Sequence, residues 1–104
     1  MFSFVETRLF TRLVAEYLSD AEYGELQAAL MTNPDAGAVV PGSGGVRKLR
    51  WAAPGRGKRG GFRVIYYVRR GHGVIWMLTI YPKNVVENIP HHVLRQIRKE
   101  IDDG

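Results

Sequence analysis

The sequence predicts a single α+β domain, in which an N-terminal strand and a helical hairpin pack on a mostly antiparallel sheet and a C-terminal helix follows. Three observations support this fold class. Helical periodicity occupies the first third of the chain, β-branched and aromatic runs fill the middle, and helical periodicity returns at the end. The 104 residues suffice for one hydrophobic core and are too few for two. No repeat or linker divides them, so we expect residues 1–104 to form one domain.

The N-terminal third is predicted to form a short strand and two helices. The opening MFSFVE alternates aromatic residues with other side chains, which favours a strand. Thr7 is a suitable N-cap for a first helix, and Ser19 with Glu22 has the capping-box spacing that starts a second. The second helix is predicted to end just before Pro34, because a proline disfavours helical geometry in the residue that precedes it. The first helix would bury an apolar stripe formed by Leu9, Phe10, Leu13, Val14 and Tyr17.

The middle of the chain is predicted to form a loop and three strands. Residues 35–45 are rich in glycine and contain a proline, which disfavours regular structure. VRKLRW (46–51) alternates apolar and basic residues, as in a strand with one covered face. GFRVIYYV (61–68) and GVIWMLTIY (73–81) are β-branched and aromatic throughout, which is typical of strands covered on both faces. The short glycine-containing link between them suits a hairpin.

The last segment is predicted to be a helix. Asn88 is a suitable N-cap and Pro90 fits the first turn, where a proline removes no helical hydrogen bond. The apolar residues at helical spacing are Val93, Leu94, Ile97 and Ile101.

The charge is distributed unevenly along the chain. Residues 1–35 contain six acids and two bases, residues 36–86 contain ten bases and no acid, and residues 87–104 contain four acids and three bases. A field of one sign attracts phosphates and releases their counterions. A basic surface kept only for solubility would normally mix the two signs. The sequence therefore favours a polyanionic partner.

Several kinds of site are excluded or disfavoured. The absence of cysteine excludes a disulfide scaffold, a thiol nucleophile and a cysteine-based metal site. No phosphate-binding loop with a Lys-Ser/Thr ending is present, and the acid-free middle disfavours a two-metal nuclease. We expect no metal and no cofactor. The start of the chain does not resemble a secretory signal and no apolar run reaches membrane-spanning length, so we expect a cytoplasmic protein without membrane contact.

Four cations are the candidate catalytic residues. Lys48 and Arg50 lie two positions apart on one predicted strand, so their side chains leave the same face. Arg63 interrupts an apolar run at the start of the next strand, and would lie near that pair if the two strands form a hairpin. Lys83 ends the last strand close to Tyr81. A scissile phosphate needs such a patch, because negative charge develops on its oxygens, and the 2′-hydroxyl of RNA can serve as the nucleophile without a metal.

Other residues are candidates for binding or proton transfer. Charges on an exposed strand also serve merely to prevent aggregation, and this alternative applies to Lys48 and Arg50. Tyr67 and Tyr81 are the tyrosines predicted to lie at the surface, whereas the remaining large aromatics of the strands are predicted to lie in the core.

His91 and His92 are adjacent at the start of the last helix, where either is a candidate acid–base group but the two diverge too much for a metal pair. The residues expected to contact RNA are Arg47, Arg56, Lys58, Arg59 and Tyr81.

The segments RKLRW, GGFRVIYY and LTIYPKN, preceded by two helices, resemble the RelE/HigB group of bacterial type II toxin–antitoxin toxins. The resemblance extends from about Phe4 to Ile101 and implies a RelE-like fold and a ribosome-dependent messenger-RNA endonuclease without cofactors. The basic residues of the family match Lys48, Arg50, Arg63 and Lys83, and the match implies that the arginine after the glycine-aromatic pair stabilises the transition state.

The chain departs from the family at two positions. Asn84 stands where RelE-like chains often have another arginine, and no tyrosine follows Tyr81 to match their C-terminal catalytic tyrosine. General acid–base catalysis would therefore fall to a lysine, to Tyr81, or to His91 or His92.

The resemblance also implies partners. These are a cognate antitoxin of the HigA type with a helix-turn-helix domain, the ribosome and its messenger RNA, and DNA only through the antitoxin complex. Two alternatives remain open: a ParE-like toxin that inhibits gyrase without cutting RNA, and a nucleic-acid-binding module without catalytic activity.

Overall fold

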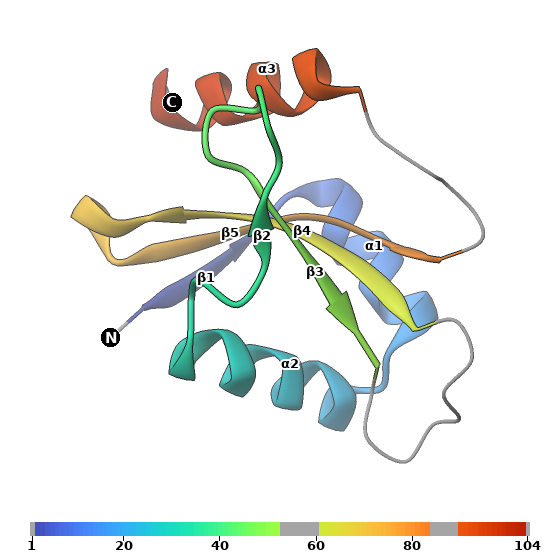
Figure 1. Ribbon diagram of the computed structural model, residues 1–104. Helices are drawn as coiled ribbons and strands as arrows, with labels where there is room; N and C mark the ends of the chain where they lie inside the picture. Colours follow the sequence, from blue (N-terminus) through green and yellow to red (C-terminus); the bar gives the residue numbers. More distant parts are fainter. Residues whose placement is uncertain (1, 53–60, 84–89, 104) are drawn as a thin grey trace.

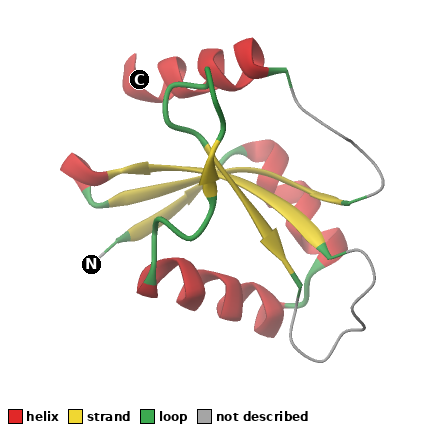
Figure 2. Ribbon diagram, viewed as in Figure 1, coloured by secondary structure: helices red, strands yellow, loops and turns green. Residues whose placement is uncertain are grey.

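A five-stranded mixed sheet lies between helices on both of its faces (Figures 1 and 2). The structure is a computed structural model and describes residues 2–52, 61–83 and 90–103. The elements in chain order are β1 (Ser3–Glu6), α1 (Arg8–Tyr17), α2 (Asp20–Thr32), β2 (Ala38–Val39), β3 (Arg47–Trp51), β4 (Phe62–Arg69), the 3₁₀ turn η1 (Arg70–His72), β5 (Val74–Pro82) and α3 (His91–Asp103). The predicted α+β fold class is confirmed.

The strands are ordered β1-β5-β4-β3-β2 across the sheet. Strands β2 to β5 form an antiparallel meander, and β1 pairs in parallel with β5. The parallel pair arises because the chain leaves β1, passes through α1 and α2, and enters the sheet again at the opposite edge (Figure 1). The mostly antiparallel sheet is therefore as predicted, whereas the short strand β2 lies inside the segment predicted to be a loop.

Local capping groups set the limits of the two N-terminal helices. The Thr7 hydroxyl accepts a hydrogen bond from the Phe10 amide at the start of α1. At the start of α2, the Ser19 hydroxyl accepts from the Glu22 amide and the Glu22 carboxylate accepts from the Ser19 amide. These bonds satisfy backbone donors that have no partner within the helix. Helix α2 ends before Pro34, and all three predicted boundaries are confirmed.

The sheet carries one hydrophobic core on each face. The face that α1 and α2 cover contains the buried residues Phe10, Val14, Leu18, Leu26, Leu30, Phe62, Val64, Tyr66, Ile75, Met77 and Ile80. The face that α3 covers contains Val46, Ile65, Leu78, Tyr81, Leu94 and Ile101. Because β4 and β5 contribute to both cores, the sequence of each is apolar throughout. Leu9 departs from the predicted stripe of α1, since it is 43% exposed.

A β-bulge changes the alternation of side chains along β5. Ile65 pairs with Thr79 and Tyr66 pairs with Met77, so Leu78 is an extra residue without a partner on β4. Met77 therefore faces α1 and α2, Leu78 faces α3, and the residues that follow are shifted by one position relative to a regular strand.

Helix α3 lies across the second face of the sheet (Figure 1). It begins at His91, directly after Pro90, whose carbonyl accepts a hydrogen bond from the Leu94 amide. Asn88, the predicted N-cap, lies outside the described residues. Within the parts of the chain that the structure describes, no helix is long and apolar enough to span a membrane.

The free energy of unfolding is expected to depend on alkaline pH through two tyrosines, the half-buried Tyr23 and the buried Tyr66. Burial and a hydrogen bond to Glu6 raise the pKa of Tyr23 above its ordinary value, and burial raises the pKa of Tyr66. Both phenols therefore stay protonated in the folded protein at pH values where the unfolded chain loses its protons. Stability is complete below about pH 10 and falls as the pH rises above it, by at most about 1.4 kcal/mol per pH unit for each tyrosine.

Urea unfolding between pH 8.5 and 11 measures this effect, with Tyr23→Phe as the matched variant. The free energy of unfolding of Tyr23→Phe should fall less steeply with pH than that of the unaltered protein. Equal slopes would show that Tyr23 ionises alike in the folded and unfolded states.

Candidate functional site

A row of candidate site residues crosses three strands on the face of the sheet that α3 covers in part. Arg50 of β3 is the direct antiparallel partner of Arg63 of β4, which in turn pairs with Tyr81 of β5. Lys48 lies two residues before Arg50 and therefore on the same face. The expectation that Arg63 lies beside the Lys48–Arg50 pair is confirmed.

Three of these cations have no neutralising neighbour in the part of the chain that the structure describes. Among the described residues, no hydrogen bond or ion pair involves the side chain of Lys48, Arg50 or Arg63. Arg50 is exposed and the other two are half-buried. Directly opposed residues of neighbouring strands have Cβ atoms about 5 Å apart, so two arginines in this position repel each other. An anion bound between them would relieve this repulsion.

Gly61 lies at the end of the site, where the backbones of neighbouring strands approach closely. Its φ of 47° lies in the left-handed region, and a Cβ at this position would lie 2.8 Å from the carbonyl oxygen of Trp51. The Gly61 carbonyl accepts a hydrogen bond of 3.3 Å from the Lys83 amide, which extends the pairing of β4 and β5 beyond Pro82. Gly61 thus lies close to β3 and is hydrogen-bonded to the residue after β5, two positions before Arg63. In the sequence, Gly61 is marked only by its position before the aromatic residue in GGFR. The close approach of the backbones could not be predicted from that position.

Lys83 lies just beyond the last strand and is exposed. Because the bulge shifts the alternation of β5, Tyr81 is on the face of Arg63, and the residue two positions later is expected on that face as well. Lys83 lies outside the strand, so its grouping with the other three cations and its catalytic role stay predictions.

Tyr81 differs from its predicted position at the surface. It is only 5% exposed and packs in the second core with Leu78 and Leu94, because α3 covers this part of the face. Burial raises the pKa of Tyr81, and the charge of Arg63 partly offsets this shift. The phenol is therefore protonated at neutral pH and can donate a proton or a hydrogen bond.

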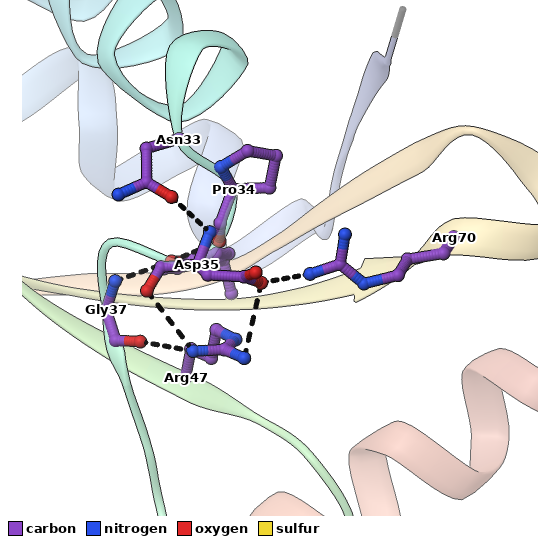
Figure 3. A network of polar contacts seen from close by, with 7 residues as sticks. Asn33, Pro34, Asp35, Gly37, Arg47 and Arg70 are labelled. Atoms are coloured by element: carbon purple, nitrogen blue, oxygen red, sulfur yellow. Dashed lines mark hydrogen bonds and ion pairs between the residues drawn. The ribbon is translucent and has the colours of Figure 1, made fainter.

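Arg47 lies on the opposite face of β3 from Lys48 and Arg50. It pairs with Tyr66, and its guanidinium contacts the Asp35 carboxylate at 3.3 Å (Figure 3). Asp35 is the last acid before the acid-free segment, and the sequence analysis did not single it out. The only signal for its role was this solitary carboxylate next to a long basic region.

The other predicted site residues fall largely outside the described structure. Arg56, Lys58 and Arg59 lie outside the described residues. His91 is the first residue of α3 and its side chain is outside the described part, while His92 is exposed. Within the described ranges, no three His, Asp or Glu side chains are grouped closely enough to hold a metal ion.

A comparison with protein-family models gives one further finding. The model described as "RelE toxin of RelE / RelB toxin-antitoxin system" matches residues 5–102, which is nearly the whole chain and includes all three strands of the site.

Proposed function

Because the chain belongs to the RelE toxin family and is a toxin of a toxin–antitoxin system, we propose that it is a ribosome-dependent endonuclease that cleaves messenger RNA and so inhibits translation in the cytoplasm. The observation that carries this proposal is the row of Arg50 and Arg63 beside Lys48, which concentrates positive charge on one face of the sheet, without an acidic partner among the described residues. RNA is the polyanion that fits this charge and also contains its own nucleophile.

The cations would act on the scissile phosphate. When the 2′-oxygen attacks phosphorus, a second negative charge develops on the phosphoryl oxygens. Arg63 is best placed to stabilise it, because it lies in the centre of the row between Arg50 and Tyr81. An arginine donates two parallel hydrogen bonds to such oxygens, whereas Lys48 and Lys83 would supply point charges. Removal of one donor of this kind from an enzyme typically slows the reaction about 10²–10³-fold.

Proton transfer requires two further roles: removal of the 2′-hydroxyl proton and protonation of the 5′-oxygen leaving group. Tyr81 suits the acid role rather than the base role, because its pKa is raised and the phenol holds its proton at neutral pH. His91 or His92 would take the base role, because an imidazole can be neutral at physiological pH, whereas a lysine would serve as an acid.

The toxin has a cognate antitoxin as its partner, as the family requires. We propose in addition that the antitoxin is of the HigA type, that its helix-turn-helix domain provides the DNA contact of the complex, and that the ribosome with its messenger RNA is the substrate. The basic loop residues Arg56, Lys58 and Arg59 would hold the RNA backbone.

The test compares a translated message with the same message lacking a start codon, after a short induction of the toxin. Primer extension should reveal cuts at discrete positions within the translated message and leave the untranslated one intact. Equal cleavage of both would overturn the ribosome dependence. Growth arrest with both messages intact would overturn the nuclease function and favour inhibition of gyrase, which a supercoiling assay detects.

A further inference from the structure

We propose that Asp35 and Arg47 form a positioning pair for the cleavage site, and that Arg47 does not contact RNA. The proposal rests on the proposed ribonuclease function, which it deepens. It assigns the task of holding Lys48 and Arg50 in place to a network on the opposite face of the sheet.

Arg47 fastens the loop between α2 and β2 to the strand that carries the site. Its guanidinium donates to the carbonyl of Gly37 at 2.7 Å and to that of Asp35 at 3.3 Å, and it also contacts the Asp35 carboxylate. Arg70, from the turn between β4 and β5, donates to the same carboxylate. Figure 3 shows both guanidinium groups directed toward Asp35, that of Arg70 from the right and that of Arg47 from below.

Tyr66 provides a second attachment of the same loop. Its buried hydroxyl donates to the Pro34 carbonyl at 2.7 Å and accepts from the Gly37 amide at 2.8 Å. A shift of the loop would therefore break the buried bond from the Gly37 amide, and the loss of a buried hydrogen bond costs about 1–3 kcal/mol.

The fastened loop touches the backbone of Lys48. A Cβ on Gly37 would lie 3.0 Å from the carbonyl carbon and oxygen of Lys48 and 2.9 Å from the ring of Tyr66, so glycine allows this close approach. Strand β2 follows at once, with Ala38 opposite Lys48 and Val39 opposite Arg47.

Strand β2 has only two residues, so ladder bonds alone hold the outer edge of β3 weakly. The side-chain network adds the missing constraint at the position of Lys48. Since a displacement of about 1 Å at a reacting group can reduce the rate by about 10²-fold, such a constraint matters for catalysis.

The arrangement also separates the two kinds of cation. Arg47 and Arg70 share one acid on one face, whereas Lys48, Arg50 and Arg63 face the other side without an acidic partner among the described residues. Arg47 therefore belongs to the scaffold, although it is adjacent in sequence to Lys48.

The experiment uses the purified full chain and programmed ribosomes. The cleavage rate at saturating toxin and the affinity for ribosomes are measured separately for Asp35→Asn, Arg47→Gln, Arg47→Lys and the double variant Asp35→Asn/Arg47→Gln. Asp20→Asn is the matched control, because it makes the same charge change at an exposed position in the first turn of α2. All rates are taken at a temperature at which circular dichroism shows that every variant is folded.

We expect each single variant to lower the saturated rate about tenfold while the affinity for ribosomes stays within about twofold. Arg47→Lys should be as slow as Arg47→Gln, because an ammonium group cannot bridge two carbonyls and a carboxylate in the planar geometry of the guanidinium. The double variant restores the original net charge and should nevertheless remain slow, no slower than either single variant.

Two results would overturn the positioning role. One is a loss of ribosome affinity in Arg47→Gln that Arg47→Lys restores, which would identify Arg47 as an RNA contact. The other is an unchanged saturated rate in Asp35→Asn. In contrast, an unaltered protein that cleaves no ribosome-bound message would overturn the ribonuclease function itself, and with it this role.

Discussion

Replacement of Arg63 by alanine is expected to lower the rate of messenger-RNA cleavage about 10²–10³-fold and to abolish growth arrest. Arg63 lies in the centre of the cationic row, between Arg50 and Tyr81, and no protein group among the described residues neutralises it. Its charge and its paired donors are therefore available to the developing negative charge on the phosphate. The measurement is single-turnover cleavage on ribosomes, which isolates the chemical step from binding.

Two variants show whether the effect belongs to chemistry. Arg63→Lys keeps the charge but loses the paired donors, so its rate should lie between those of the alanine variant and the unaltered protein. Arg12→Gln removes a charge at an exposed position of α1 and should leave the rate unchanged. Full cleavage by Arg63→Ala would show that the catalytic assignment is wrong. Because Arg63 makes no described side-chain bond, the alanine variant should unfold at nearly the same temperature as the unaltered protein.

Replacement of Phe10 by alanine is expected to lower the free energy of unfolding by about 3–5 kcal/mol. Phe10 is fully buried in the core between the helical pair and the sheet, and its ring centroid lies 5.7 Å from that of Tyr23. The substitution removes a large apolar surface from the core and leaves a cavity that the rigid sheet cannot fill. Domains of this size are commonly stable by only about 5–15 kcal/mol, so the variant would lose much of its stability.

Leu9→Ala is the matched control for this prediction. Leu9 is the preceding residue of the same helix and is 43% exposed, so its replacement should change the free energy of unfolding by about 0.5 kcal/mol or less. Urea denaturation of the three proteins gives the comparison. A loss below about 1 kcal/mol for Phe10→Ala would contradict its place in the core. The two losses of activity also differ in kind: Phe10→Ala acts through the amount of folded toxin, and Arg63→Ala acts in a fully folded one.

The sequence alone predicted the features that depend on residues close together in the chain. The caps at Thr7 and Ser19 and the end of α2 before Pro34 each involve groups within four positions, and all three proved correct. The shared face of Lys48 and Arg50 also follows from strand alternation, which needs no tertiary information. Their pairing with Arg63 was predictable because a hairpin makes neighbouring strands in the sequence neighbours in space.

Only the tertiary structure decided the features that depend on distant contacts. The extra residue Leu78 places Tyr81 on the face of Arg63, whereas regular alternation from Met77 would have placed Tyr81 against α1 and α2. Such a bulge has no reliable signature in an apolar run, because it is chosen by the packing of two cores on one strand.

The same limit applies to Arg47 and Asp35. The run RKLR presents three cations of equal appearance, and only the loop after α2, 12 positions away in the sequence, supplies the acid that separates Arg47 from the other two. The periodicity of the chain thus determined its elements and the face of each strand, because these are short-range properties of the backbone. Which cations are neutralised and which remain available to a phosphate was decided by partners that meet only when the sheet is assembled.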